Sequence, residues 1–270
     1  MKMNCVELFN WSDPQIALIT GASSGLGETY ARTLANLGFN LILVARRKER
    51  MEILAEELSK AHKVDIQVVV ADLTIDSEIH RVADLISKTK NLDILVNNAG
   101  FGSKGLFHEN DFTRQLEMLK VHVEVPIILT RRALESMVPN NRGVIINMSS
   151  LGSFIPTRGA VMYVATKTFV RAFSESISQE LKNTNIKIQA LCPGFTKTEY
   201  HSVGELKDFD KSKIPKGMWM EPEKVVEISL TQIKKGKAVV IPGFINKFSN
   251  FLIKVPGIGK LIISGVNKKT

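Results

Sequence analysis

The segment IALITGASSGLG, residues 16–27, decides the fold that we expect for this chain. It opens with a short apolar run typical of a buried strand, and its glycines fall where that strand gives way to a helical pattern. Glycine permits a tight turn and a close approach of the backbone to a pyrophosphate, and the amino terminus of the helix supplies free N–H groups. The spacing G-x-x-x-G-x-G differs from the commoner G-x-G-x-x-G, so its weight comes from the strand–turn–helix context. The predicted contacts to a dinucleotide are Gly21, Ser23, Ser24, Gly25, Leu26 and Gly27.

The same alternation of apolar runs and helical patterns continues along the chain. We expect strands at residues 40–45, 66–71, 92–97, 143–149, 186–191 and 238–241. Helices are expected at 26–37, 47–62, 75–89, 113–137 and 161–181, with another beginning near Pro222. Apolar strands separated by helices imply right-handed βαβ units. The sequence therefore predicts an α/β fold with a doubly wound, Rossmann-type parallel sheet and helices on both faces. No linker or repeat interrupts the pattern, so we expect one domain over residues 1–270.

Composition argues against several classes of protein. Hydrophobic residues make up 44% and charged residues 23% of the 270 residues, as in an ordinary soluble domain. The two cysteines are far apart and the histidines lack ligand spacing, so we expect neither disulfides nor a metal. Residues 1–13 hold no apolar signal segment and no apolar run reaches about 18 residues, which favours a cytoplasmic protein without a membrane span. The net charge of +9 is dispersed, so we expect no nucleic-acid partner.

The end of the second expected strand indicates which nicotinamide cofactor fits. Dinucleotide folds that prefer NAD usually carry an acidic residue about 20 residues past the glycines, where it binds the ribose 2′-hydroxyl. This chain has Arg46 and Arg47 instead. A guanidinium suits a 2′-phosphate, whereas a carboxylate would repel it. The sequence therefore predicts NADP(H), the alternative being that both arginines are solvated residues of a first helical turn.

Four motifs occur together in the order and context of a known family. They are the glycine loop, the segment Asn97-Asn98-Ala99-Gly100 after the fourth strand, Ser150, and the segment Tyr163-Val164-Ala165-Thr166-Lys167. On these motifs, residues 14–200 resemble the short-chain dehydrogenase/reductase family. The resemblance implies an NADP(H)-dependent oxidoreductase that interconverts a ketone or aldehyde and an alcohol.

The resemblance also implies further contacts to the cofactor, for each of which ordinary turn chemistry is the alternative. They are Asp72 and its neighbour Leu73 at the adenine, Asn98, Ala99 and Gly100 at the adenosine ribose, and Pro193, Gly194 and Thr196 beside the nicotinamide carboxamide.

The chemistry is expected at Ser150, Tyr163 and Lys167. Tyr163 and Lys167 are four residues apart on a helix, so their side chains share one face. A free tyrosine has a pKa near 10, and a neighbouring ammonium would lower it toward the range useful for acid–base catalysis. By resemblance, Ser150 hydrogen-bonds the substrate oxygen and Lys167 also holds the nicotinamide ribose. The alternatives are a helix cap at Ser150 and a core aromatic at Tyr163.

One position departs from the family pattern. The family usually has an asparagine in the helix after the Asn-Asn-Ala-Gly segment, where it helps to hold a water in a proton relay. Here His122 falls at that position. Imidazole can donate and accept hydrogen bonds, so we include His122 among the catalytic candidates, with a satisfied structural histidine as an equal alternative.

The determinants of the substrate are expected after residue 194. The stretch 195–220 contains Met218-Trp219-Met220 among charges, which fits a mobile lid over an apolar substrate or, equally, an ordinary surface loop. Residues 231–270 contain eight lysines, no acidic residue and interleaved apolar side chains. A helix packed on its own protein is favoured there. Docking through residues 248–270 on an anionic membrane or an acidic carrier protein is the alternative, and it would favour a lipid-like substrate, 3-oxoacyl or steroid-like.

Two interpretations other than a dehydrogenase stay open. The chain could bind NADP as a sensor or scaffold without turnover, or it could be a peripheral lipid-binding protein that uses its basic tail. An epimerase is disfavoured because little chain remains after Gly194 for a sugar-nucleotide domain. The resemblance further implies a homodimer or homotetramer that pairs through two long helices.

Overall fold

A parallel sheet forms the middle of the computed structural model, which describes residues 5–9, 11–202 and 204–255. Seven strands of these residues pair in the order β3-β2-β1-β4-β5-β6-β7, and every pairing is parallel. The strands are β1 Ile16–Thr20, β2 Asn40–Ala45, β3 Ile66–Val70, β4 Leu92–Asn97, β5 Gly143–Met148, β6 Ile186–Leu191 and β7 Val239–Val240. The chain builds outward from β1 in one direction and from β4 in the other. The carboxyl ends of β1 and β4 therefore form the crevice in which doubly wound folds bind ligands.

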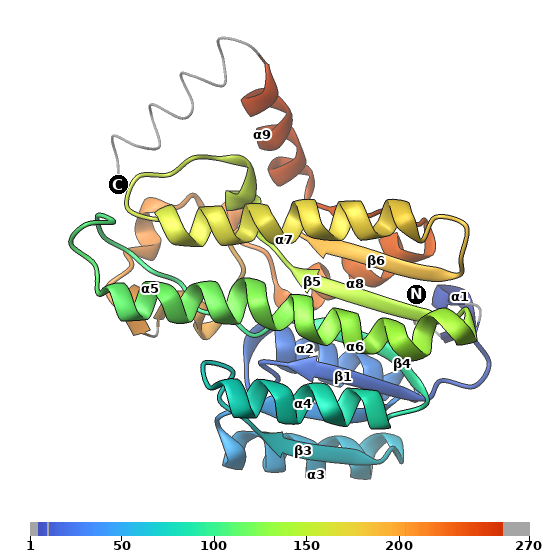
Figure 1. Cartoon of the computed structure of the whole chain (residues 1–270). Coiled ribbons are helices and arrows are strands. Elements are labelled where there is room, and N and C mark those ends of the chain that lie inside the picture. The colour runs from blue at the N-terminus through green and yellow to red at the C-terminus, as the bar shows by residue number, and fades with distance from the viewer. Residues whose placement is uncertain (1–4, 10, 203, 256–270) are drawn as a thin grey trace.

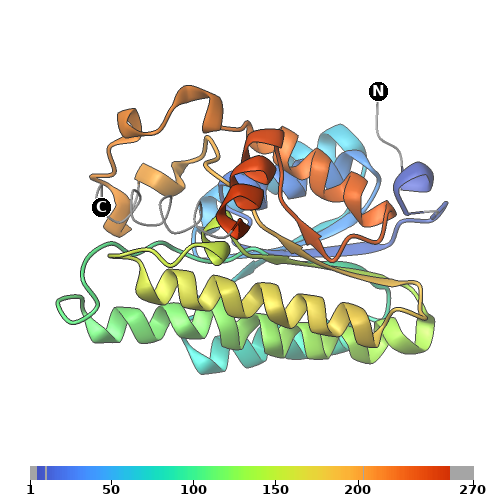
Figure 2. The same ribbon diagram turned by 90° about the horizontal axis from the view of Figure 1, so that it is seen from above.

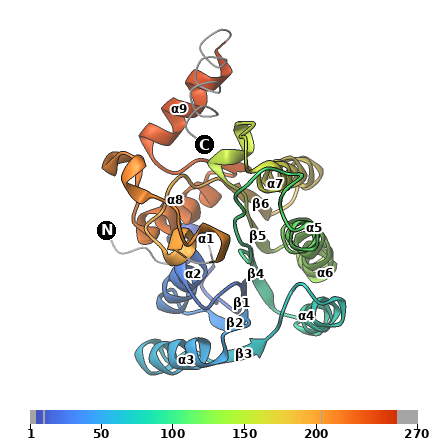
Figure 3. The same cartoon turned by 90° about the vertical axis from the view of Figure 1, so that its left-hand side faces the viewer.

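Helices cover both faces of this sheet. Figure 3 shows α2, α3 and α8 on one face and α4, α5–α6 and α7 on the other. The helices are α1 Cys5–Phe9, α2 Gly25–Asn36, α3 Lys48–His62, α4 Asp76–Lys88, α5 Phe112–Leu119, α6 Val125–Asn140, α7 Val161–Glu180, α8 Pro222–Lys234 and α9 Phe244–Lys254. Each face has its own apolar cluster, because strands buried on both sides carry apolar residues at nearly every position. The predicted doubly wound fold is confirmed.

The helix expected at 113–137 is interrupted. A π-helical segment, Lys120–Glu124, separates α5 from α6, and the Val125 N–H bonds to the Lys120 carbonyl five residues back. Neighbouring side chains, Val121 and His122, are consequently both buried. The extra residue rotates the side chains before the segment by about 100° relative to those after it, and a single helical period applied to residues 113–137 does not detect that shift.

The last strand is also shorter than expected, two residues instead of 238–241, because it pairs with β6 only at Val239 and Val240.

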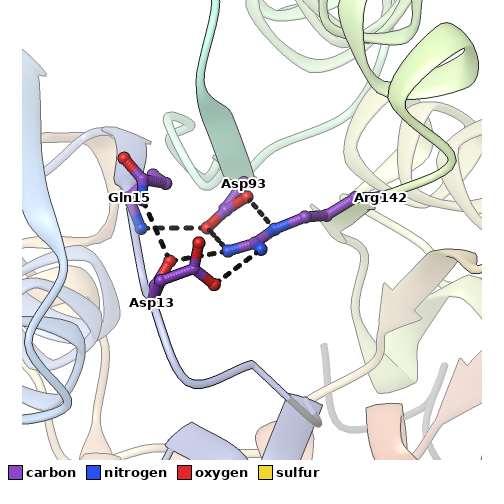
Figure 4. A network of polar contacts seen from close by, with 4 residues as sticks. All are labelled: Asp13, Gln15, Asp93 and Arg142. Atoms are coloured by element: carbon purple, nitrogen blue, oxygen red, sulfur yellow. Dashed lines mark hydrogen bonds and ion pairs between the residues drawn. The ribbon is translucent and has the colours of Figure 1, made fainter.

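The amino ends of the central strands are held together by one arginine, at the end of the sheet opposite to the glycine loop (Figure 4). Arg142, just before β5, donates to both carboxylate oxygens of Asp93 on β4, each at 2.7 Å. It also donates to the Asp13 carboxylate at 2.9 Å, and the Gln15 N–H donates to Asp93 at 2.9 Å. The Asp93 carboxylate is buried, so this network supplies the partners that a buried charge requires.

Helix α9 extends away from the sheet (Figure 1). Its exposed side carries Phe244, Phe248 and Phe251, which are 82%, 51% and 63% exposed. The side that meets the protein instead carries Asn246 and Asn250, both buried. The predicted helix in the tail is therefore present over residues 244–254, but with its apolar side outward, and residues 256–270 of that tail lie outside the described range. None of the helices in the described part of the chain is long and apolar enough to cross a membrane.

Candidate active site

Ser150, Tyr163 and Lys167 come together at the carboxyl edge of the sheet. Ser150 is the second residue after β5, and the other two lie on consecutive turns of α7. The Ser150 hydroxyl accepts the Gly152 N–H at 3.0 Å and is hydrogen-bonded to the Tyr163 side chain. Lys167 Nζ lies 5.9 Å from the centre of the Tyr163 ring and donates to the Met148 carbonyl at 2.9 Å. A hydroxyl, a phenol and an amine thus share one small volume.

Burial shifts the proton affinity of both titratable members of this set. It lowers the pKa of Lys167 from 10.5 to about 7, because the ammonium is removed from water. It raises the pKa of Tyr163, and the hydrogen bonds from Ser150 and Tyr200 oppose that rise only in part. The phenol is therefore protonated at neutral pH in the ligand-free chain, which is the form that can donate a proton.

His122 lies beside this set, with its ring centre 6.0 Å from that of Tyr163, and both of its ring nitrogens are paired. Nε2 accepts the Phe101 N–H at 3.1 Å, which assigns the ring proton to Nδ1. Nδ1 then donates to the Thr166 hydroxyl at 3.0 Å. Burial, with the charge of Lys167, holds the pKa of His122 well below 6.5. This arrangement favours the structural alternative over the proton relay.

The glycine loop has the shape that the sequence predicted. Gly21 and Gly25 have φ values of +66° and +57°, a backbone region that disfavours other residues. A Cβ at Gly27 would clash with the Gly21 carbonyl oxygen, so α2 begins in contact with the loop. Leu26 and Gly27 belong to the first turn of α2, whose N–H groups an anion can reach.

Asn98 and Ala99 hold this loop against β4. The Asn98 side chain donates to the Thr20 carbonyl at 3.0 Å and the Gly21 carbonyl at 3.2 Å. The N–H groups of Asn98 and Ala99 both donate to the Thr20 hydroxyl at 3.0 Å. Gly100 packs on His122, where a Cβ would lie 2.8 Å from Nε2. This segment therefore connects the loop to the catalytic set.

The two predicted arginines make different contacts. Arg47 donates to the hydroxyls of Ser23 at 3.1 Å and Ser24 at 2.5 Å, which ties it to the glycine loop. Arg46 lies 3.7 Å from the Asp72 carboxylate. Burial raises the pKa of Asp72, but hydrogen bonds from Thr74 and Arg46 outweigh it and hold that pKa below its usual value. Leu73, next to Asp72, is buried.

The segment after β6 lies between the catalytic set and α9. The Pro193 carbonyl accepts the Leu151 N–H at 2.8 Å. Gly194 packs against the Asn246 side chain of α9, and a Cβ there would lie 2.6 Å from Nδ2. The Thr196 hydroxyl donates to the Gly194 carbonyl at 3.2 Å, and Thr196 pairs with Met220 in an isolated parallel bridge.

Sequence reasoning missed several residues that the fold adds to the site. Glu199 places one carboxylate oxygen 2.5 Å from Arg47 Nη1 and the other 2.8 Å from Arg50 Nη1. Burial raises its pKa, but hydrogen bonds from Arg50, Ser24 and Arg47 lower it to about 2. Thr198 lies over Gly25, and the Tyr200 hydroxyl is hydrogen-bonded to Tyr163. Arg50 could have been found from its place one turn after Arg47, whereas nothing local marks residues 198–200.

The stretch 195–220 gathers beyond the carboxyl ends of the strands (Figure 2). Phe195, His201, Phe209 and Trp219 form an aromatic cluster within it, with ring centres 5.2–6.1 Å apart. These ring contacts, between half-buried side chains, hold the stretch together.

These features define a class of protein: a doubly wound fold with a dinucleotide loop beside a serine, a tyrosine and a lysine. A family model described as short chain dehydrogenase matches residues 15–206. The chain belongs to the short-chain dehydrogenase family, whose members are oxidoreductases that bind a nicotinamide cofactor.

Relatives and solved structures agree with this assignment. The 3-oxoacyl-acyl-carrier-protein reductase FabG of Aquifex aeolicus is 31% identical over 219 residues, 80% of this chain and 88% of that protein. A short-chain dehydrogenase of Sphingobium yanoikuyae, solved in complex with NADPH, is 29% identical and has a TM-score of 0.80, covering 93% of this chain and 96% of its own. The inactive hydroxysteroid dehydrogenase-like protein 1 of Homo sapiens is 28% identical over 184 residues, 67% of this chain and 56% of that protein.

Proposed function

We propose that this chain is an NADP(H)-dependent reductase of a ketone or aldehyde, with Tyr163 as the proton donor. The observation that carries the proposal is the contact between the Ser150 and Tyr163 hydroxyls with Lys167 behind the phenol ring. Bound NADPH would supply the hydride to the carbonyl carbon. Ser150 donates a hydrogen bond to the carbonyl oxygen, and Tyr163 transfers its proton to the same oxygen. Lys167, when charged, stabilises the phenolate that remains.

The preference for NADP(H) is supported by the charges around the glycine loop. The loop has the bare backbone that a pyrophosphate needs, and Arg46 and Arg47 follow β2 where an acid would select NAD. Arg47 already holds an anionic group of this chain, the carboxylate of Glu199. The residues present therefore fit a cofactor with a 2′-phosphate. The remaining contacts proposed are Asp72 and Leu73 at the adenine and Pro193, Gly194 and Thr196 at the nicotinamide.

The proposed substrate class is lipid-like, a 3-oxoacyl or steroid-like ketone. The aromatic cluster of residues 195–220 supports it, since it would give a bound substrate an apolar cover. The Aquifex relative, a 3-oxoacyl-acyl-carrier-protein reductase, agrees with this class.

The experiment is cofactor absorbance with NADPH and, separately, NADH over a panel of ketones and aldehydes, beside the Tyr163→Phe variant. Turnover with NADPH that is weak with NADH and lost in Tyr163→Phe would support the reaction, the cofactor and the proton donor together. NADPH binding without turnover would instead support a silent NADP-binding sensor, in line with the inactive human relative. A His122→Asn variant that restores turnover would then assign the silence to His122.

Two finer proposals concern partners. The outward phenylalanines of α9 and the absence of acidic residues in 231–270 favour peripheral contact with an anionic membrane as a second function, to be tested by co-sedimentation with anionic and neutral vesicles. Exposed apolar residues on α5 and α7, which run side by side (Figure 2), favour pairing of two copies through these helices. They include Phe112, Leu116 and Phe169, and the mass in solution tests this pairing.

A further inference from the structure

The carboxylate of Glu199 is held as a bound anion would be. Its two oxygens face two different guanidinium groups, those of Arg47 and Arg50, at 2.5 Å and 2.8 Å. Ser24 adds a hydrogen bond to the same carboxylate. The Glu199 side chain is 28% exposed and those of Arg47 and Arg50 are 40% and 54% exposed, so this ion pair is partly accessible to solvent and to a ligand. Two arginines and a hydroxyl around one anion form the donor set that recognises a phosphate monoester.

The position of this set is that of the adenosine end of the cofactor. Arg47 joins the end of β2 to the glycine loop through Ser23 and Ser24. The residue that reads the ribose 2′ position in doubly wound folds comes from this strand end. The carboxylate of Glu199 therefore occupies the place of a 2′ substituent, although it comes from the stretch after β6, 149 residues after Arg50.

We propose that Arg47, Arg50 and Ser24 form the cradle for the 2′-phosphate, and that Glu199 fills it in the ligand-free chain as a built-in competitor. The inference rests on the proposed use of NADP(H). A phosphate, with more charge and more acceptor oxygens than a carboxylate, displaces Glu199. NADH has no group that can do so. Glu199 therefore lowers the affinity for a ligand that carries a 2′-phosphate and leaves a ligand without one largely unaffected.

The neighbours of Glu199 extend the consequence to the catalytic set. Thr198 lies over Gly25, where a pyrophosphate would approach, and the Tyr200 hydroxyl bonds to Tyr163. The chain is anchored before them, because the Lys197 N–H donates to the Met220 carbonyl at 2.9 Å. Glu199 thus belongs to a short stretch whose two neighbouring residues contact the glycine loop and Tyr163.

Calorimetric titration with adenosine 2′,5′-bisphosphate tests the competitor, with adenosine 5′-monophosphate as the ligand without the 2′-phosphate. We expect Glu199→Gln to tighten bisphosphate binding about fivefold to tenfold, as removal of a modest competing ion pair should. Binding of the monophosphate should change less than twofold. The matched control is Glu57→Gln, which removes an acid that is ion-paired with Arg32 at 2.6 Å and is no partner of Arg47 or Arg50. It changes the net charge by the same amount as Glu199→Gln.

A second variant tests the cradle. In the Glu199→Gln background, Arg50→Gln should weaken bisphosphate binding about tenfold and leave the monophosphate unchanged. Thermal melts establish that each variant is folded, as expected for partly exposed side chains.

The outcomes separate the two levels of the proposal. If the unaltered protein binds both ligands equally, the proposed use of NADP(H) fails, and this inference with it. A second outcome is that the unaltered protein prefers the bisphosphate but Glu199→Gln leaves bisphosphate binding unchanged, weakens it, or changes it only as much as Glu57→Gln does. The proposal that Glu199 competes with the 2′-phosphate is then overturned, and the cofactor proposal stands. If Arg50→Gln is without effect in the Glu199→Gln background, Arg50 is not part of the cradle.

Discussion

Replacement of Arg142 by methionine should destabilise the protein more than any exposed ion pair can explain. The change keeps much of the aliphatic stem but removes the guanidinium that donates to both oxygens of Asp93 (Figure 4). The Asp93 side chain is 5% exposed, so water cannot replace the lost donors, and only the Gln15 N–H remains. The stacking of the guanidinium over Trp11, at 4.6 Å, is lost as well.

The size of the effect follows from this burial. Removal of one partner of a buried pair costs about 3–5 kcal/mol, and the lower end applies here because the Arg142 side chain is 26% exposed. At about 2 °C per kcal/mol for a chain of this length, the thermal midpoint should fall by about 6 °C. Differential scanning calorimetry at pH 7.5 measures the midpoint, and urea unfolding gives the free energy. The matched control is Arg132→Met, which breaks an exposed pair with Glu135 at 3.1 Å and should cost less than about 0.5 kcal/mol.

A double variant makes the argument refutable. If the cost is that of an unpaired buried carboxylate, adding Asp93→Asn to Arg142→Met should recover part of the lost stability. The reasoning is refuted if Arg142→Met and Arg132→Met lower the thermal midpoint equally. It is also refuted if adding Asp93→Asn to Arg142→Met costs as much stability as Asp93→Asn costs on its own, because Arg142 would then not be stabilising the buried carboxylate.

Three further predictions concern buried polar groups. Because the folded chain keeps His122 neutral while the unfolded chain takes up a proton, stability should fall as the pH drops below about 6.5, and His122→Asn should flatten that part of a plot of thermal midpoint against pH. The pKa of Lys167 is lowered to about 7 in the folded chain, so between pH 7 and 10.5 the unfolded chain binds one proton more at this side chain than the folded chain does. The stability of the ligand-free protein should therefore rise with pH across that window, and Lys167→Met should abolish the rise. Tyr30→Phe removes the donor of a 2.6 Å bond to Ser229 in the core and should cost about 1–2 kcal/mol in urea unfolding, whereas no measurable cost would show that Ser229 is satisfied without it.

The predictable part of the molecule is the part that local patterns encode. The glycine loop, Ser150 and the pair Tyr163–Lys167 are fixed by strand ends and helix spacing, and the structure brings all of them to one edge of the sheet. Glu199 could not be predicted in this way, since its contact with Arg50 depends on how the stretch after β6 folds back toward the end of β2. The orientation of α9 could not be predicted either. The side that packs on the protein carries Asn246 and Asn250, which a hydrophobic pattern assigns to the solvent-exposed side.

The π-helical segment has a consequence for how this chain can vary in length. Deletion of one residue between Lys120 and Glu124 would restore an ordinary α-helix. It would also rotate α5 about the helix axis by about 100° relative to α6. The exposed side chains of α5 would then face another direction, and His122 would lose its contact with the Phe101 N–H. Among natural variants of this sequence, insertions and deletions should therefore be tolerated in the loop before α5 and be absent from residues 120–124. A change of one residue in that segment would alter both the exposed surface of α5 and the contacts of His122 in the site.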